Sequence, residues 1–278
     1  MAHLQVNFMS EALMRTVTIH VILPTDKLVP PGCPKPAGGP YKTLYLLNGI
    51  MGNHTDWCNA TNIQILAETY NIAVVMPGGE NRFYLDFEPT HELYGEFVGR
   101  ELVEATRKMF PLSDRREDTF IAGVSMGGYG ALRNGLKYSE NFGYIAGIST
   151  AMVLYDLKSR TDEHPMFLET KSYAETIFGD FDTVMDSDKN PLWLAKKLIE
   201  NGKPLPELFL MIGTDDFLYA SNQRLRKDLD ALGISYEYAE APGDHDWNFW
   251  KDAILKVLDW LPLKEEQTER LHSGNVGL

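Results

Sequence analysis

Short apolar runs alternate with amphipathic stretches along most of the chain. Runs rich in β-branched and aromatic residues predict strands, at residues 16–23, 43–47, 72–76, 119–124, 144–148, 208–212 and 235–239. Helical spacing of apolar residues predicts helices, at residues 63–70, 93–110, 126–138, 191–200, 222–232 and 247–260. This strand–helix–strand order predicts an α/β protein whose mostly parallel central sheet carries helices on both faces.

Three stretches interrupt the alternation. Residues 150–190 lack clear periodicity, and we interpret them as an insertion that forms a small cap over the carboxyl edge of the sheet. The Pro/Gly-rich stretch 29–40 is interpreted as a surface turn, and the polar end of the chain as a flexible tail. We therefore expect a single domain over residues 1–265, with the cap at about 150–190 and the tail at 266–278.

The composition agrees with one large globular domain and argues against several kinds of partner. The 278 residues are 44% hydrophobic and 23% charged, enough for a substantial buried core. The 26 basic and 39 acidic side chains give a formal net charge of −13, which opposes binding to nucleic acid or an anionic membrane. Cys33 and Cys58 belong to no CxxC or Cys/His motif, so we expect no disulfide framework, no metal and no cofactor.

The start of the chain lacks the basic residues, apolar run and cleavage site of a secretory signal. No apolar stretch approaches the ~20 residues of a membrane-spanning helix. We therefore expect a cytoplasmic protein without a membrane partner, and the sequence leaves a homo-oligomer open.

One short motif carries the first sign of chemistry. Gly123-Val124-Ser125-Met126-Gly127 fits G-x-S-x-G, in which the glycines let a sharp turn lift the serine hydroxyl clear of the sheet. The motif stands directly after a predicted strand and directly before a predicted helix, which is the context that it requires. Ser125 is therefore the candidate nucleophile.

A serine hydroxyl needs a base that removes its proton during attack, and the sequence offers seven histidines. In hydrolases with this motif the triad follows the order Ser, acid, His, so the base must come after Ser125. His164 falls in the irregular insertion and His272 in the tail. His245 stands in a turn between the last predicted strand and the last predicted helix, and is the candidate base.

The acid of the triad should follow the predicted strand 208–212, which comes before the strand that leads to His245. Two adjacent aspartates, Asp215 and Asp216, stand there. We favour Asp216, because the spacing Gly213-x-x-Asp216 places it past the turn with apolar residues after it. Asp215 stays open as the alternative, since either aspartate can also serve as a turn residue or a helix cap.

Acyl transfer also needs N–H donors aimed at the oxyanion that develops on the substrate. The backbone N–H of Met126 can supply one. The second is expected from the loop after an earlier strand, and residues 47–53 form a Gly-rich strand exit that is suitably placed. Ile50, directly after Gly49, is our candidate, although a simple turn without a catalytic role stays open here.

Taken together, these residues resemble the esterase D family, which includes tributyrin esterases, S-formylglutathione hydrolases, feruloyl esterases and mycolyltransferases. The resemblance covers nearly the whole chain and rests on four groups of residues: 46–49 with Gly52, Asn53 and Trp57; 123–132; 213–218; and 245–247 with Trp250. It implies an α/β-hydrolase fold and carboxylic-ester hydrolysis. It also implies the roles named above: Ser125, Asp216 and His245 as the triad, Ile50 and Met126 as oxyanion donors.

Within the family the sequence is most similar to the tributyrin-esterase group, which acts on short acyl chains and sometimes on acetyl or feruloyl groups attached to sugars. Formylglutathione hydrolases have Ser-Gly-Leu-Thr-Cys at the first loop, where this chain has Asn48-Gly49-Ile50-Met51-Gly52, so a glutathione thioester is a less favoured substrate. Mycolyltransferases are exported, whereas this sequence shows no signal.

We therefore expect a serine carboxylesterase for acetyl to butyryl esters, or for feruloyl or acetyl groups on sugars. The alternatives are a formylglutathione-type thioesterase, an acyltransferase with a sugar hydroxyl as acceptor, and a non-catalytic binding module on the same scaffold. Because a histidine must be neutral to act as a base, activity is expected to rise through about pH 6 to 7.

Histidines near strand exits and aromatic residues of the insertion are the candidates for contact with a small-molecule ester. The candidate residues are His54, Trp57, His91, Tyr155, His164 and Phe167, with Met166 and Phe178 as further contacts. For each residue of the insertion, packing that holds the cap together explains it equally well. For His54 and His91, a solvated histidine is the simpler explanation.

Overall fold

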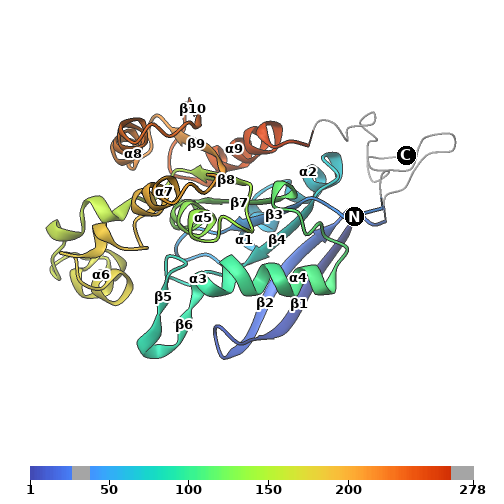
Figure 1. Cartoon of the computed structure of the whole chain (residues 1–278), viewed down its shortest axis with the longest axis horizontal. Helices are drawn as coiled ribbons and strands as arrows, with labels where there is room; N and C mark the ends of the chain where they lie inside the picture. The colour runs from blue at the N-terminus through green and yellow to red at the C-terminus, as the bar shows by residue number, and fades with distance from the viewer. Residues whose placement is uncertain (27–37, 264–278) are drawn as a thin grey trace.

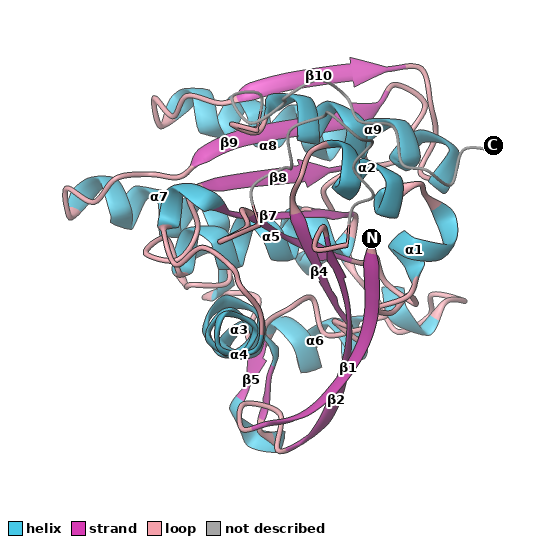
Figure 2. Cartoon of the chain, turned by 90° about the vertical axis from the view of Figure 1, so that its right-hand side faces the viewer, coloured by secondary structure: helices cyan, strands magenta, loops and turns pink. Residues whose placement is uncertain are grey.

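The computed structural model describes residues 1–26 and 38–263. Within these residues, eight strands form one sheet in the order β1-β2-β4-β3-β7-β8-β9-β10 (Figure 1). The strands are β1 (Ala2–Ser10), β2 (Arg15–Leu23), β3 (Thr43–Leu47), β4 (Ala73–Pro77), β7 (Thr119–Val124), β8 (Tyr144–Ile148), β9 (Glu207–Gly213) and β10 (Glu237–Ala241). The pairs β1–β2 and β2–β4 are antiparallel and all other neighbours are parallel, so the predicted mostly parallel sheet is confirmed. Figure 2 shows the strands as a twisted layer from β10 at one edge to β1 at the other.

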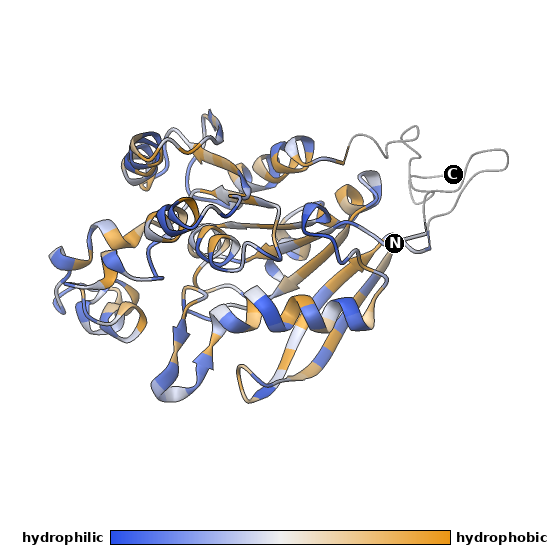
Figure 3. Ribbon diagram, viewed as in Figure 1, coloured by the Kyte–Doolittle hydropathy of each residue, from blue (hydrophilic) through white to orange (hydrophobic). Residues whose placement is uncertain are grey.

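Helices pack on both faces of the sheet, as predicted. One buried apolar cluster joins the strands to α1 (Asp56–Ala60), α2 (Ile63–Thr69) and α9 (Trp247–Trp260). The other joins them to α4 (Leu102–Met109), α5 (Met126–Lys137), α7 (Pro191–Glu200) and α8 (Tyr219–Ala231). In the central strand β3, Leu44 and Leu46 enter the first cluster, and Tyr45 and Leu47 the second. A strand that is buried on both faces is mostly apolar, and the strands in the middle of Figure 3 are mostly orange.

Shorter elements complete the described chain. α3 (Tyr94–Glu96) leads through one π-helical turn, η2 (Phe97–Glu101), into α4, and α6 (Lys171–Phe178) lies in the insertion. The 3₁₀ turns are η1 (Glu88–Thr90), η3 (Arg116–Asp118), η4 (Val153–Tyr155), η5 (Leu157–Ser159), η6 (Phe167–Glu169) and η7 (Val184–Asp186). The segment 150–190 thus holds one helix and several single turns, which agrees with its poor periodicity in the sequence.

The structure differs from the prediction mainly at the edges of the fold. β1 is not predicted, because this edge strand pairs with β2 alone and every second side chain of residues 3–9 is exposed. The predicted helix 93–110 corresponds to α3, η2 and α4, which together span residues 94–109. The hairpin before it, in which β6 (Glu92–Leu93) pairs with β5 (Asp86–Phe87), is not predicted. α1 is also unpredicted. The ends of the other predicted helices and strands differ from the observed ends by at most three residues.

Two predicted segments fall largely outside the described part of the chain. The turn at 29–40 is described only from residue 38, and the tail at 266–278 lies wholly outside it. Among the described residues, none of the helices combines the length and the apolar character that crossing a membrane would require.

Candidate active site

Ser125 stands at a sharp turn between β7 and α5. Its backbone has φ +56° and ψ −118°, a strained conformation for a residue with a side chain. The two glycines of the motif make the turn sterically feasible. A Cβ on Gly123 would lie 2.4 Å from the carbonyl oxygen of Gly127, and a Cβ on Gly127 would lie 2.6 Å from that of Asn48. Any larger residue at either position would push the turn away from the sheet.

A continuous hydrogen-bond chain runs from Ser125 to Asp216 through His245. Nε2 of His245 lies 3.0 Å from Oγ of Ser125, and Nδ1 lies 2.9 Å from Oδ2 of Asp216 and 3.1 Å from Oδ1. A carboxylate can only accept, so Nδ1 carries the proton of a neutral ring and Nε2 is left to accept from the serine hydroxyl. The structure thus brings the three predicted triad residues together, from the ends of β7, β9 and β10.

Asp216 is the buried member of the group, with only 3% of its surface exposed. Its Oδ1 also accepts the backbone N–H of Leu218 at 2.8 Å. Burial works to raise the pKa of this carboxyl, but hydrogen bonds from His245, Leu218 and Ser149 outweigh it, so the pKa lies below the ordinary value. Asp216 is therefore ionised at neutral pH.

Aromatic rings hold the imidazole in place. The ring of Phe217 lies 4.5 Å from that of His245 between centroids, and the ring of Trp250 lies edge-on at 4.9 Å. Trp250 in turn donates its indole N–H to Oγ of Ser149 at 3.1 Å. Phe217 is one of the apolar residues expected to pack beneath Asp216, but it is 74% exposed and packs against His245 instead. The sequence predicts no role for Ser149. The position of Ser149 directly after β8 is the one signal that could have pointed to it.

The loop after β3 lies beside Ser125. A Cβ built on Gly49 would be 3.6 Å from Cβ of Ser125, which places Ile50 next to the nucleophile along the chain. The side-chain amide oxygen of Asn48 accepts from Tyr84 Oη at 3.0 Å and from the N–H of Gly79 at 3.3 Å, which fixes the loop.

The two predicted oxyanion donors both border this site. Within the described residues, the N–H of Ile50 has no hydrogen-bond acceptor. Met126 is the first residue of α5, a position whose N–H has no partner inside its own helix. Both N–H groups are thus available to a ligand beside Ser125.

Two grooves are lined by residues that neighbour the triad or the first loop along the chain. One, of about 520 Å³, runs between the start of the insertion and the turn after Asp216. Its walls include Met152, Val153, Arg160, His164, Phe217 and Leu218. The other, of about 320 Å³, lies at the first loop, with Ile50, Met51 and Trp247 in its walls. The insertion reaches the nucleophile itself, because the N–H of Ala151 donates to the carbonyl oxygen of Ser125 at 3.1 Å.

Of the predicted substrate contacts, only His164 lines one of these two grooves. Trp57 is 1% exposed and donates its indole N–H to the carbonyl of Leu47 at 3.0 Å, so its predicted contact with substrate is wrong. Tyr155 donates to Asp228 of α8 at 2.6 Å and carries Arg224 over its ring, which is packing of the insertion.

The other three candidates line neither groove. His91 contacts the carbonyl of Glu11 at 3.3 Å, in a surface groove between β1 and α4. Phe167 is 67% exposed and packs against Tyr173 of α6. His54 packs against the ring of His20 on β2, and burial lowers its pKa. The further residues Met166 and Phe178 line neither groove: the first is exposed and the second is buried in the core.

Comparison with known proteins decides the family. The model of the family described as "Putative esterase" matches residues 10–261. The chain is 41% identical to an acetyl esterase of Caldicellulosiruptor saccharolyticus over 261 residues, which cover 94% of this chain and 98% of that protein. The chain belongs to this esterase family. It is a carboxylic-ester hydrolase that acts on small-molecule esters, and the predicted resemblance is confirmed.

Solved structures of esterases share the whole fold. Fluorophosphonate-binding serine hydrolase F of Staphylococcus aureus, solved with substrate bound, has a TM-score of 0.80 and 29% identity, covering 94% of this chain and 98% of its own. S-formylglutathione hydrolase of Staphylococcus aureus has a TM-score of 0.78 and 30% identity, and the match again covers 94% of this chain and 98% of its own. A ferulic acid esterase at 20% identity, with a TM-score of 0.68, covers 94% of this chain and 97% of its own and has the same fold. The predicted α/β-hydrolase fold is thereby confirmed.

Proposed function

We propose that this esterase hydrolyses short-chain acyl esters, acetyl to butyryl, through an acyl-enzyme on Ser125. The observation that carries the proposal is the unbroken hydrogen-bond chain from the Ser125 hydroxyl through His245 to the buried carboxylate of Asp216. In the first step, Oγ of Ser125 forms a bond to the ester carbonyl carbon while Nε2 of His245 takes the hydroxyl proton. The bond from that carbon to the alcohol oxygen then breaks, and His245 gives the proton to the leaving alcohol.

Water completes the cycle by the same route. It loses a proton to Nε2 of His245 as its oxygen attacks the acyl carbon, and the bond to Ser125 breaks as the proton returns to Oγ. Asp216 stays ionised throughout, orients the ring and stabilises its protonated form. In both steps the N–H groups of Ile50 and Met126 donate to the negatively charged oxygen, a contribution of about 3 kcal/mol for each donor.

The acetyl esterase at 41% identity supports a short acyl group. The groove at Phe217 and Leu218 and the groove at Ile50 offer separate places for the acyl and alcohol parts of a small ester. The proposal leaves the alcohol part of the ester open, so it includes acetyl or feruloyl esters of sugars. An acyltransferase would use the same triad with a sugar hydroxyl in place of water.

A thioesterase of the formylglutathione type is the second candidate. It is favoured by the solved S-formylglutathione hydrolase at 30% identity. Against it stands the first loop, where Gly52 occupies the position of the cysteine in the formylglutathione hydrolase pattern. A Cβ on Gly52 would overlap the carboxylate of Asp56, at 1.9 Å from Oδ2. A cysteine here would therefore require the carboxylate of Asp56 to turn away.

Labelling by a fluorophosphonate probe tests the acyl-enzyme. We expect stoichiometric modification of Ser125 in the folded protein, and no modification in Ser125→Ala. Hydrolysis of nitrophenyl acetate should fall on the order of 10⁶-fold in that variant. Labelling at another residue, or full activity without Ser125, would overturn the assignment.

A substrate panel separates the candidates. Nitrophenyl acetate, butyrate and octanoate, acetylated and feruloylated sugars, and S-formylglutathione are compared by kcat/KM. We expect the short-chain nitrophenyl esters to have the highest kcat/KM. A clear preference for S-formylglutathione would favour the thioesterase. Product analysis with an added sugar would reveal transfer in place of hydrolysis.

A further inference from the structure

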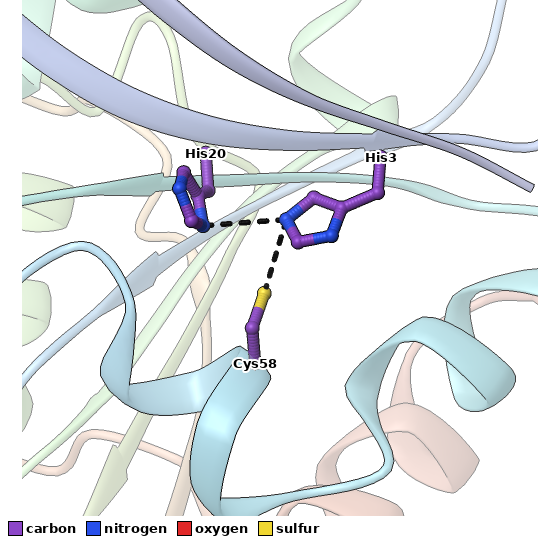
Figure 4. Close-up of side chains that lie close together, drawn as sticks. All are labelled: His3, His20 and Cys58. Carbon is purple, nitrogen blue, oxygen red and sulfur yellow. Dashed lines mark hydrogen bonds between the residues drawn. The ribbon is translucent and has the colours of Figure 1, made fainter.

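Three metal-ligating side chains from distant parts of the sequence meet on the side of the sheet that α1 covers (Figure 4). They are His3 on β1, His20 on β2 and Cys58 on α1. Nε2 of His3 lies 3.2 Å from Nδ1 of His20 and 3.6 Å from Sγ of Cys58. The proposed hydrolysis uses none of the three, and their separation along the chain hides them from any search for a short Cys/His motif.

The strand register explains why the histidines meet. His3 pairs with Ile22, and His20 pairs with Gln5, so the two histidines are diagonal neighbours on one face of the β1–β2 ladder. α1 then brings Cys58 over this face, where its Sγ also lies 3.7 Å from Sδ of Met76. The ring of His54 packs on that of His20 at 4.8 Å between centroids and limits its movement.

These separations match those of ligands around a tetrahedral zinc ion. Zinc–nitrogen bonds of about 2.0–2.1 Å and zinc–sulfur bonds of about 2.3 Å put two nitrogens about 3.3 Å apart, and nitrogen and sulfur about 3.6 Å apart. The two contacts of His3 already have these lengths. The third pair, His20 and Cys58, lies within 4.8 Å. A movement of about 1 Å would bring it to the tetrahedral value.

The donor set selects the metal. Two imidazole nitrogens and one thiolate sulfur suit zinc, whereas calcium and magnesium prefer oxygen ligands. His3 is exposed and the other two are half-buried, so an ion can enter from solvent. Cysteine binds zinc as its thiolate, so an entering ion displaces the thiol proton.

We propose that His3, His20 and Cys58 bind one Zn²⁺ ion, with water as the fourth ligand. The ion links β1 and β2 to α1, the helix that follows the loop of Ile50. Binding forms two Zn–N bonds and one Zn–S bond and releases one proton from Cys58 to solvent. The site is independent of the esterase mechanism, and its role is to fasten the edge of the sheet to α1.

Metal titration of the untagged chain tests this, since a histidine tag would add ligands of its own. Metal-free protein should take up one Zn²⁺ per chain and release one proton for each ion bound near neutral pH. Titration with Co²⁺ should produce the near-ultraviolet charge-transfer band of a thiolate–cobalt bond. Zinc should also raise Tm, because it binds the folded chain preferentially.

Single-residue variants assign the ligands. In His3→Ala, His20→Ala and Cys58→Ala, we expect zinc affinity to fall roughly tenfold or more. The cobalt–thiolate band should disappear in Cys58→Ala. His91→Ala removes an exposed histidine outside the cluster and should bind zinc as the unmodified chain does. Circular dichroism checks that each variant is folded, and exposed His3 is the safest of the three to replace.

The proposal is wrong if the three variants bind zinc as tightly as the unmodified chain. It is also wrong if the unmodified chain gives no cobalt–thiolate band. If the chain binds no zinc, labelling of Ser125 by the fluorophosphonate is still expected, so the two proposals are tested separately.

Discussion

Two adjacent aspartates leave β9, and the turn between them aims only one carboxylate at His245. Asp216 is buried and accepts from the imidazole at 2.9 Å. Asp215 is exposed, and its Oδ2 accepts the N–H of Gly243 at 3.2 Å. The second aspartate therefore supports the turn that carries His245, while the first acts on the ring itself.

Replacing Asp216 by Asn tests the role of its charge. The variant keeps the shape of the side chain but removes the negative charge, and its amide can direct an N–H at Nδ1. The ring would then hold the wrong tautomer and could not accept the serine proton at Nε2. We expect kcat to fall on the order of 10⁴-fold, with KM little changed, in steady-state hydrolysis of nitrophenyl acetate.

Asp215→Asn is the matched control. Its side-chain oxygen can still accept from Gly243, so we expect kcat to stay within a few-fold of the unmodified enzyme. A larger loss in this variant than in Asp216→Asn would reverse the assignment of the acid.

At the residue scale, the parts of the site that the sequence predicts are those fixed by short local motifs. Ser125 follows from the glycines around it, and His245 from its place between the last strand and the last helix. Contacts made through packing are not visible in this way. Trp250 reaches Ser149 from an element about a hundred residues away, and Trp57 proves to be a core residue. Such pairings depend on how helices sit on the sheet.

At the scale of elements, the turn from β7 to α5 is a tight junction of the site. It leaves no room for a side chain at Gly127, where a methyl group would meet the backbone of both Leu47 and Asn48 at 2.6 Å. Backbone atoms cannot rotate aside as a flexible side chain can. Strain introduced here must therefore move the turn relative to the loop of Ile50.

We expect Gly127→Ala to separate Ser125 from the oxyanion donors. Loss of one donor alone costs about 10²- to 10³-fold in kcat, and this variant should lose at least that much. Steady-state kinetics and fluorophosphonate labelling rates provide the measurement. Gly38→Ala is the control, because a Cβ added to Gly38 has nothing within 4 Å. It should leave kcat and the labelling rate unchanged. Normal kinetics in Gly127→Ala would show that the turn tolerates the shift.

How well the sequence predicts a strand depends on the place of that strand in the sheet. The central strands β3, β7 and β8 are predicted to the residue, because burial on both faces makes most of their residues apolar. β1 and the β5–β6 hairpin are not predicted, since strands with exposed side chains have a weaker apolar signal. The break before α4 is hidden for a similar reason: the apolar residues of 93–103 have helical spacing whichever turn type they adopt.

At the scale of the whole molecule, one buried guanidinium joins three separate parts. Arg133 on α5, with a 1% exposed side chain, lies 2.6 Å from Asp188 at the end of the insertion and 3.5 Å from Asp86 of β5. Lys137, one turn further along α5, contacts the same carboxylates at 2.7 and 3.4 Å. The insertion and the hairpin are thus fastened to the helix that begins at Ser125.

We expect Asp188→Asn to destabilise the fold. Removing one partner of a buried ion pair commonly costs 3–5 kcal/mol, but Asp188 is 38% exposed and Lys137 and Asp86 remain near Arg133. Solvent screening reduces the expected loss of unfolding free energy to about 1–3 kcal/mol at neutral pH. Urea unfolding followed by tryptophan fluorescence measures it. Asp182→Asn, in an exposed pair with Lys158, is the control and should change stability little.

The pH dependence of this loss identifies its electrostatic origin. Burial works to raise the pKa of Asp188, but Arg133 and Lys137 outweigh it, so the folded-state pKa lies below the ordinary value of 3.8. A group with a lowered pKa stabilises the fold above its unfolded value and loses that contribution as pH falls through the folded value. The difference between Asp188→Asn and the unmodified chain should therefore be constant above about pH 5 and shrink below about pH 4. A difference that persists undiminished into acid would mean that Asp188 acts through packing, because an uncharged amide and a protonated carboxyl would then remain unequal.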